Sequence, residues 1–415
     1  MDLYYSFSVL IVLASFFSYL NLRYLKLPST IGIMIIAMIS SVILVITGNI
    51  FPKTFSNFST LLQDVDFTEV LMGAMLNFLL FAGAIHINLK DLREQRGPIV
   101  IFSSVSVIIS TFVVGGIMYY LAPLLHVQIP FIYCLLFGAL ISPTDPIAVM
   151  GVLKEAKVRK SLETKVAGES LFNDGVAVVV FAVILQLAQG TDIDISFGNI
   201  TWLLIKEAAG GFLLGAVLGV LASKSMRRID DYKVSVLITL SVVMGGYLIA
   251  HAMHISGPLT MVAAGIVIGN YGKRIAMSAQ TKDYLNKFWE LIDDILNAIL
   301  FLFIGFELLI IKNVTDYWLI GTVSILVVLL ARFISIYIPV LIIPFKNKFS
   351  PGTIKILVWG GLRGGVSIAL ALSMDEGPYK SILVSVTYFV VVFSIIVQGL
   401  TVGKLATRVL SKEEV

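Results

Sequence analysis

The chain has 415 residues, of which 58% are hydrophobic and only 13% carry a charged side chain. Soluble domains are about one-quarter charged, and apolar runs of about twenty residues recur along this sequence, so we exclude a soluble globular protein and predict an all-α polytopic membrane protein. The single cysteine, Cys134, excludes a disulfide framework and a cysteine-based zinc site.

Apolar runs bounded by glycine, proline and charge clusters predict thirteen membrane-spanning helices. Their approximate ranges are 4–20, 29–47, 67–87, 98–121, 130–152, 161–188, 200–222, 234–252, 257–271, 286–311, 315–343, 352–374 and 381–402. The first run lacks a basic leader, so it is predicted to be a retained helix and not a cleaved signal peptide. We expect a single membrane domain over residues 1–415, with no soluble domain.

The distribution of basic residues predicts the orientation of these helices. With the N-terminus outside, the outer loops hold only Lys53, Lys312 and Lys380, beside Asp192 and Asp194. The inner loops then hold twenty-four of the thirty basic residues, namely Arg23, Lys26, Lys90, Arg93, Arg96, Lys154, Lys157, Arg159, Lys160, Lys165, Lys224, Arg227, Arg228, Lys233, Lys273, Arg274, Lys282, Lys287, Lys346, Lys348, Lys355, Lys404, Arg408 and Lys412. This positive-inside asymmetry predicts an outer N-terminus and a cytoplasmic C-terminus in the inner (plasma) membrane.

Two of the predicted helices are interrupted. Residues 142–146 break the fifth span and residues 360–365 break the twelfth. Interrupted helices at matching places in two halves indicate a transport site between inverted repeats. The pattern predicts repeats over 1–189 and 234–402, joined by a linking helix at 200–222.

The first interruption offers oxygen atoms at membrane depth. Pro143 and Pro146 each lack an N–H donor and restrict the preceding residue, so the helix must open there. Open backbone is tolerated within a membrane only where it is buried in protein or lines a cavity. Thr144 and Asp145 add a hydroxyl and a carboxylate to the freed carbonyls, an oxygen set suited to a hard cation. The alternative is a proline kink at which Asp145 caps the second half-helix.

The sixth span carries a polar face. Glu169, Ser170, Asn173 and Asp174 stand at relative positions 0, 1, 4 and 5, on one side of a helix. Serine and asparagine alone could form a structural seam between helices. A charge costs roughly 2.5–3.5 kcal/mol at the centre of a membrane helix, however, so the carboxylates require a role. We predict that Asp174 binds a cation and a proton by turns.

The second interruption contains Arg363, whose guanidinium stays charged. A buried guanidinium needs an anion, and Glu169, Asp145 and Asp174 are the buried candidates. Pairing Arg363 with Glu169 leaves two carboxylates facing one cavity, which attracts a monovalent cation or protons. The alternative is that Arg363 clamps an anionic substrate.

Other polar and small residues receive weaker assignments. Four of them are placed at the start of the tenth span, where acidic side chains suit a helix N-terminus or gather cations: Glu290, Asp293, Asp294 and Asn297. Glu307 is a candidate outer counterpart, and Arg332 lies mid-span without an assigned role. The ridge formed by Gly211, Gly215 and Gly219 suits close packing, either within the chain or in a dimer.

Three motifs in this order resemble the monovalent cation:proton antiporter-1 family, which includes the NhaP-type sodium/proton antiporters and the animal sodium/proton exchangers. The motifs are Ser-Pro-Thr-Asp-Pro at 142–146, Gly-Glu-Ser-Leu-Phe-Asn-Asp-Gly at 168–175 and Gly-Gly-Leu-Arg-Gly-Gly-Val-Ser at 360–367. The resemblance covers essentially the whole membrane region. It implies the sodium/proton antiporter fold, with thirteen helices, a dimerisation domain, a six-helix core containing two crossing broken helices, and a homodimeric assembly. We expect no enzymatic activity, no cofactor and no nucleic-acid partner.

The resemblance also implies roles for individual residues. Asp174 resembles the essential carboxylate that binds cation and proton alternately, and Asn173 the asparagine that marks the electroneutral branch. The matching motifs assign the remaining positions: Thr144, Asp145 and Ser170 as further sodium ligands, and Glu169 with Arg363 as a structural ion pair. One feature departs from some archaeal members, which carry a glutamate where this chain has Ala82 in Leu80–Ala84.

The predicted function is exchange of one Na⁺, or of Li⁺ or K⁺, for one H⁺. The core would reorient only when Asp174 is neutralised by either ion, since moving a bare charge across the membrane is costly. The alternatives are a K⁺/H⁺ antiporter, an anion symporter with Arg363 as clamp, and a channel or sensor without coupling.

Overall fold

A computed structural model describes residues 2–48, 70–146, 149–150, 153, 158, 160–190, 197–229, 231–309, 311, 314–345 and 349–413. Within these ranges the regular structure is entirely helical, which confirms the predicted all-α class. Several positions used in the charge and span predictions lie outside the described residues: Lys53, Lys154, Lys157, Arg159, Asp192, Asp194, Lys312, Lys346, Lys348 and most of 147–152.

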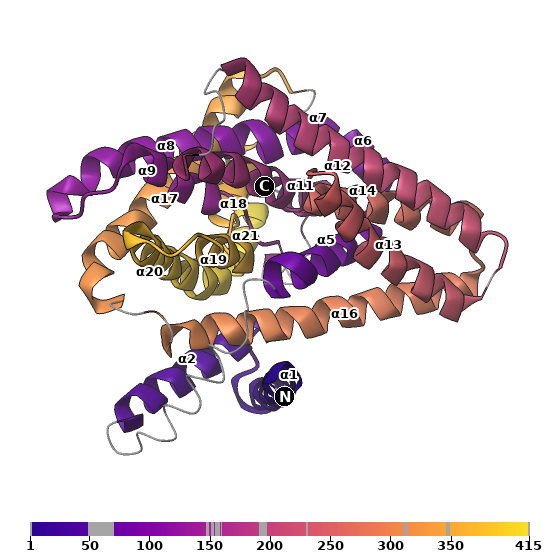
Figure 1. The fold of residues 1–415 in the computed structure, drawn as a ribbon, viewed down its shortest axis with the longest axis horizontal. Helices are drawn as coiled ribbons and strands as arrows, with labels where there is room; N and C mark the ends of the chain where they lie inside the picture. The colour runs from indigo at the N-terminus through magenta and orange to yellow at the C-terminus, as the bar shows by residue number, and fades with distance from the viewer. Residues whose placement is uncertain are drawn as a thin grey trace.

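The first half of the chain forms the helices that precede and include the polar face. Their bounds are α1 Asp2–Leu20, α2 Ser29–Gly48, α5 Leu76–Ile85, α6 Leu89–Glu94, α7 Arg96–Val100, α8 Ser106–Leu121, α9 Phe131–Leu140 and α11 Lys160–Ala188. A π-helical segment over Val70–Met75 leads into α5, and another over Ile101–Val105 joins α7 to α8. Figure 1 shows α8 and α9 side by side.

The second half forms the remaining helices. Their bounds are α12 Phe197–Met226, α13 Tyr232–Ala252, α14 Gly257–Val267, α15 Lys273–Ile275, α16 Ala279–Phe306, α17 Trp318–Ile342, α18 Pro351–Trp359, α19 Gly365–Leu372, α20 Pro378–Phe393 and α21 Gly399–Glu413. Figure 1 shows α16 running along one side of the molecule, with α2 packed against it. A π-helical segment over Ser394–Gln398 connects α20 to α21.

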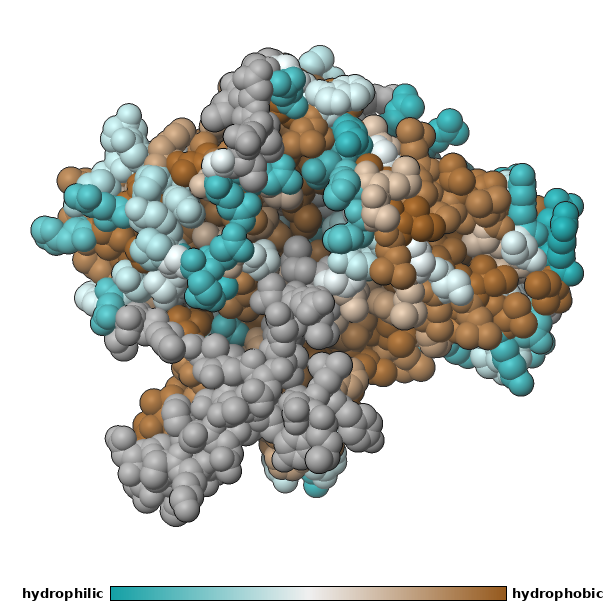
Figure 2. All heavy atoms as spheres, viewed as in Figure 1, coloured by the Kyte–Doolittle hydropathy of each residue, from teal (hydrophilic) through white to brown (hydrophobic). Residues whose placement is uncertain are grey.

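Helices long and apolar enough to cross a bilayer number eight within the described residues. Helical residues also occur in each of the other predicted spans, as shorter helices, interrupted pairs or the less apolar α16. Hydrophobic side chains face outward on α12 and α13, where Phe212, Leu213 and Leu248 are exposed, and Figure 2 shows this hydrophobic surface with hydrophilic residues at its edge. Such a surface matches lipid rather than water.

The small-residue ridge of α12 packs inside the monomer. A side chain built at Gly211 would collide with the carbonyl oxygen of Ser256, and one at Gly215 with that of Thr260. Glycine therefore lets α12 approach α14 closely. Close packing of α12 against α14 within one chain therefore explains the small residues of this ridge.

The tenth predicted span begins earlier than expected. The helix α16 starts at Ala279, where Ser278 Oγ accepts a hydrogen bond from the backbone N–H of Thr281 at 3.3 Å. The acidic residues placed at the start of the span therefore stand in the middle of the helix. Their assignment to a helix N-terminus is wrong.

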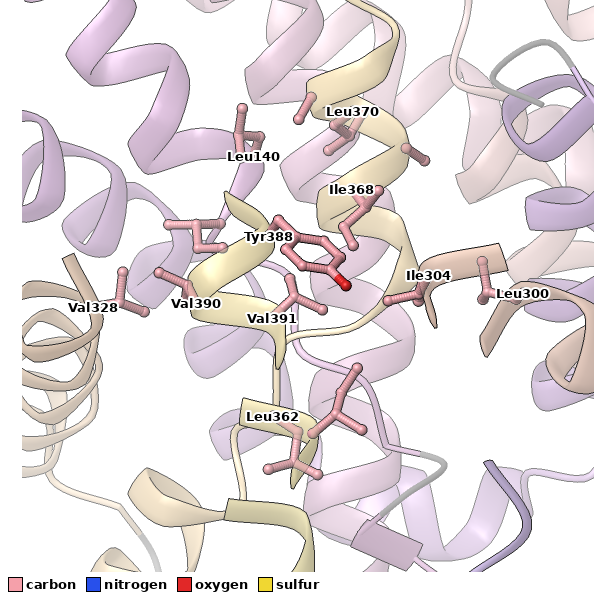
Figure 3. Close-up of a cluster of buried hydrophobic side chains, with 14 of the residues drawn as sticks. Leu140, Leu300, Ile304, Val328, Leu362, Ile368, Leu370, Tyr388, Val390 and Val391 are labelled. Atoms are coloured by element: carbon pink, nitrogen blue, oxygen red, sulfur yellow. The ribbon is translucent and has the colours of Figure 1, made fainter. Parts of the chain in front are cut away.

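Both predicted interruptions are present, and they meet. Helix α9 ends at Leu140, while α18 and α19 are separated by residues 360–364. The backbone N–H of Asp145 donates to the carbonyl oxygen of Leu362 at 2.7 Å, which joins the two open segments. Figure 3 shows Leu362 and Tyr388 of α20 in one cluster of buried hydrophobic side chains. A backbone hydrogen bond thus joins the two interruptions, and Leu362 packs the second one into the apolar core.

Candidate cation-binding site

The cavity next to the interruptions has a volume of about 100 Å³. It lies where two hydrophobic cores meet, one containing Leu300 of α16 and the other containing Leu76 and Leu80 of α5. Its polar side chains come from the first interrupted segment and from two helices, α11 and α16: Thr144, Asp145, Asp174, Asp293 and Asn297. Several carboxyl groups therefore face one small space inside a largely apolar protein.

Asp174 of α11 presents an unsatisfied oxygen in this region. Its side chain is 8% exposed, and its Oδ1 has no hydrogen-bond partner in the structure. A buried acceptor without a partner is costly, and a proton or a cation bound there would remove that cost. The sequence predicted Asp174 at this position, and the structure places it in the cavity with Asp145.

Thr144 is fixed by the other two polar residues of the α11 face. Its Oγ1 accepts a hydrogen bond from Asn173 Nδ2 at 2.7 Å and lies 2.9 Å from Ser170 Oγ. The backbone N–H of Thr144 donates to Asn173 Oδ1 at 3.3 Å. Thr144 lines the cavity, whereas Ser170 and Asn173 do not. Ser170 and Asn173 therefore fix the first interrupted segment through hydrogen bonds on the side of Thr144 that does not face the cavity.

Asp145 lies against the glycine-rich interruption. A Cβ built on Gly364 would stand 2.5 Å from Asp145 Oδ2. Only glycine leaves room for the carboxylate at this approach. Glycine at position 364 thus allows the second interrupted segment to approach the carboxylate of Asp145 in the first.

Arg363 donates hydrogen bonds to backbone carbonyl groups of the first interruption. Its Nη1 donates to the carbonyl oxygens of Ser142 at 2.8 Å and Pro143 at 3.0 Å, and its backbone N–H donates to Ser394 Oγ at 2.8 Å. Buried backbone acceptors need donors, and an opened helix creates several of them. The guanidinium supplies those donors where the two interruptions meet.

The predicted ion pair between Glu169 and Arg363 is wrong. Glu169 Oε1 lies 2.5 Å from Nη1 of Arg332, and both side chains are more than nine-tenths buried. Arg332 Nη2 also donates to the carbonyl oxygen of Leu357 at 2.9 Å. The prediction counted only buried charges, whereas the carbonyls of Ser142 and Pro143 compete for Arg363. Glu169 therefore pairs with the guanidinium of Arg332 on α17.

Two further lining residues belong to the polar cluster that the sequence predicted at the start of the tenth span, where it would suit a helix N-terminus or gather cations. Asp293 and Asn297 are four residues apart, on one face of the helix, and both line the cavity. Asn297 Nδ2 donates to the carbonyl oxygen of Asp293 at 2.8 Å, and Asn297 Oδ1 has no hydrogen-bond partner among the described residues. The i, i+4 spacing of these residues in the sequence was the available signal.

Most of the chain matches known sequences. A profile described as "Sodium/hydrogen exchanger, transmembrane" matches residues 11–408. The chain is also 47% identical over 409 residues to the Na⁺/H⁺ antiporter NhaP of Pseudomonas aeruginosa, covering 96% of this chain and 95% of that protein. It belongs to the sodium/hydrogen exchanger family.

Other members agree with this assignment. The Na⁺/H⁺ antiporter NhaH of Halobacillus aidingensis is 33% identical over 385 residues, covering 91% of each chain. The sodium proton antiporter MjNhaP1 of Methanocaldococcus jannaschii superimposes with a TM-score of 0.78 at 21% identity, over 99% of this chain and 100% of that one. The fold is therefore the antiporter fold, and this exchanger-family chain is a multi-pass membrane transporter and not an enzyme.

The side of the cavity formed by α5 is apolar. Leu76, Leu79, Leu80 and Gly83 of the α5 region line the cavity and offer it no side-chain oxygen. Ala82 is fully buried and is not among the lining residues. The polar side of the cavity is formed by the first interruption, α11 and α16.

Proposed function

We propose that this chain is a secondary-active antiporter that exchanges Na⁺ for H⁺ at Asp174. The observation that carries the proposal is the buried, unpartnered Oδ1 of Asp174 beside a cavity that also holds Asp145 and Thr144. Oxygen ligands of this kind suit a hard monovalent cation. The family assignment supports exchange of a cation for protons.

The proposed cation site contains the oxygen atoms of Asp174, Asp145 and Thr144. Ser170 and Asn173 position Thr144 through the hydrogen bonds described above. The same carboxylate binds either Na⁺ or H⁺, so the two ions compete. Reorientation with an empty, charged carboxylate is disfavoured by the cost of moving a charge through the membrane, and this cost couples the two fluxes.

We propose one-for-one, electroneutral exchange. Asn173 is neutral, and its amide is occupied by Thr144. An aspartate at this position would add a charge to be compensated during each cycle. Transport by Asn173→Asp should therefore depend on membrane voltage, whereas transport by the parent chain should not. Equal voltage dependence of the two proteins would contradict this stoichiometry.

The anion-symport alternative is weakened by the hydrogen bonds of Arg363. Its Nη1 is engaged with two backbone carbonyls, and Arg363 does not line the cavity next to Asp174. An anion clamp needs donors directed at the ligand. The geometry instead assigns Arg363 to the support of the open segment.

The proposal is tested by reconstitution into liposomes with a pH-sensitive dye. Addition of Na⁺ should drive proton movement, and no Na⁺ should cross without proton counter-flow. Uncoupled Na⁺ flux would indicate a channel. Parallel additions of Li⁺ and K⁺ test the K⁺/H⁺ alternative, because a response to K⁺ without one to Na⁺ would replace sodium as the substrate.

We further propose a homodimer in the plasma membrane, with the N-terminus outside and the C-terminus in the cytoplasm. The surrounding bilayer is the partner that its apolar surface requires. The inverted repeats over 1–189 and 234–402 remain part of this proposal. The pairing of the two interruptions through Asp145 and Leu362 supports them.

A further inference from the structure

A second cavity lies away from the cation site, between α17, α18 and α21. Its volume is about 520 Å³. The lining combines three basic residues with apolar and aromatic ones: Phe333, Ile354, Lys355, Val358, Trp359, Thr401, Lys404, Leu405 and Arg408. No acidic side chain is among these lining residues. We call this cavity the basic groove.

The charges of the basic groove converge from two helices. Lys404 and Arg408 are four residues apart on α21, so they share a face with Thr401 one turn earlier. Lys355 approaches from α18. All three basic side chains belong to exposed residues, so their charged ends reach the aqueous edge of the membrane. The groove therefore presents a concentrated positive charge at its mouth.

The walls of the basic groove are apolar. Phe333 of α17 is 45% exposed, and Val358 and Leu405 are partly buried beside it. Trp359 donates from Nε1 to Thr401 Oγ1 at 2.9 Å, so the indole is held by a polar partner. Tryptophan with one polar and one apolar side is typical of the membrane interface. The matching ligand has an anionic head and an apolar tail.

The geometry points to a binding site for an anionic phospholipid. We propose that its phosphate is held by Lys355, Lys404 and Arg408, and that an acyl chain lies along Phe333 and Val358. The basic residues belong to the predicted cytoplasmic side, where basic pockets between membrane helices bind anionic head groups. An inorganic phosphate would satisfy the charges but leave the apolar walls uncovered.

The site is connected to the second interruption by hydrogen bonds. Gln398 Nε2 donates to the carbonyl oxygen of Trp359 at 3.0 Å, and its Oε1 accepts from Ser394 Oγ at 2.7 Å. Ser394 Oγ in turn accepts from the backbone N–H of Arg363. A lipid bridging Lys355 and Lys404 would therefore fasten α18 to α21 directly beside the interruption.

The test uses Trp359 as a built-in reporter. The full-length protein is reconstituted in phosphatidylcholine vesicles with increasing fractions of brominated phosphatidylglycerol, which quenches tryptophan on contact. The contribution of Trp359 is the difference between the parent and Trp359→Phe. We expect brominated phosphatidylglycerol to quench this contribution at lower mole fraction than brominated phosphatidylcholine. Equal quenching by the two lipids would overturn the proposal.

The second part of the test removes the positive charges of the basic groove. The triple change Lys355→Gln, Lys404→Gln and Arg408→Gln should weaken the phosphatidylglycerol preference about tenfold or more, since each basic residue near the surface contributes about 1 kcal/mol. A matched triple change at the end of α12 should leave it intact: Lys224→Gln, Arg227→Gln and Arg228→Gln, all at exposed positions. An unchanged preference in the groove variant would contradict the site.

Soluble competitors identify the source of the phosphate. Inorganic phosphate and glycerol phosphate, added at the concentration that saturates lipid quenching, should fail to displace the brominated lipid. Displacement by either one at that concentration would assign the groove to a free phosphate compound and reject the lipid. Each measurement is of binding and does not depend on the exchange activity proposed above.

Discussion

Glu169 and Arg332 are joined as a buried pair, which makes them a structural unit. Glu169→Gln leaves the guanidinium without its carboxylate, and breaking a buried pair costs roughly 3–5 kcal/mol. We therefore expect a clear drop in the thermal unfolding temperature of the purified protein, larger than any change in the apparent sodium affinity. A normal unfolding temperature with altered sodium affinity would instead place Glu169 at the cation.

Glu307 is the matched control for that experiment. It is 1% exposed, its Oε2 has no hydrogen-bond partner, and no ion pair joins it to another described residue. Because burying an unpaired charge is unfavourable, Glu307→Gln should leave the unfolding temperature unchanged or raise it. A loss as large as that of Glu169→Gln would show that Glu307 also has a stabilising partner.

The individual residues of the site were predictable to different degrees. Asp174, Asp145 and Thr144 followed from polar groups placed in apolar helices, because an ionisable group inside a membrane is costly and marks an ion pathway by default. The partner of Glu169 did not follow. Two arginines and three carboxylates were available, and the choice depends on how α17 packs and on the carbonyls of Ser142 and Pro143.

The two interrupted segments act as a unit because glycine allows close approach. Gly364→Ala would direct a methyl group at Asp145 Oδ2. We expect a severalfold higher sodium concentration for half-maximal exchange, because the carboxylate must move to make room. Gly116→Ala is the control, since a Cβ at Gly116 has no neighbour within 4 Å. Equal sodium dependence in both variants would separate Gly364 from the cation site.

Helix α16 brings a further carboxylate to the cavity. Asp293→Asn removes a negative charge from the lining and should weaken sodium binding severalfold without abolishing exchange. Asp283→Asn, at an exposed position paired with Lys287 on the same helix, should behave like the parent. Sodium titrations of exchange in liposomes distinguish them. Parent-like affinity in Asp293→Asn would remove α16 from the binding site.

The elements were predicted more reliably than their ends. Apolar runs located the helices, and two prolines and a glycine cluster located both interruptions, because each residue type acts on its own backbone. The start of α16 was misplaced by seven residues, from 286 to Ala279. Its first turns are amphipathic and charged, so a search for apolar runs begins too late.

The orientation of the whole molecule is open to a direct labelling test. The single cysteine, Cys134, is buried, so a Cys134→Ala background gives a clean starting point. In that background Lys380→Cys should react with a membrane-impermeant maleimide added outside intact cells, and Arg228→Cys should react only after the membrane is opened. The reverse pattern would invert the predicted topology.

At the scale of the molecule, three carboxylates and one hydroxyl line a small cavity where two hydrophobic cores and two interrupted segments meet. The exchange that we propose requires a group at this site that either ion neutralises. Among the three residues of the proposed cation site, Asp174 is the one with a buried oxygen that has no hydrogen-bond partner among the described residues.

The most direct measurement is therefore sodium-driven proton movement in liposomes containing Asp174→Asn. The change keeps the shape of the side chain but removes its ability to bind Na⁺ and H⁺ by turns, so we predict exchange at the level of empty liposomes. Asp375→Asn, at an exposed position, should exchange like the parent chain. Parent-like exchange by correctly folded Asp174→Asn would contradict the central assignment.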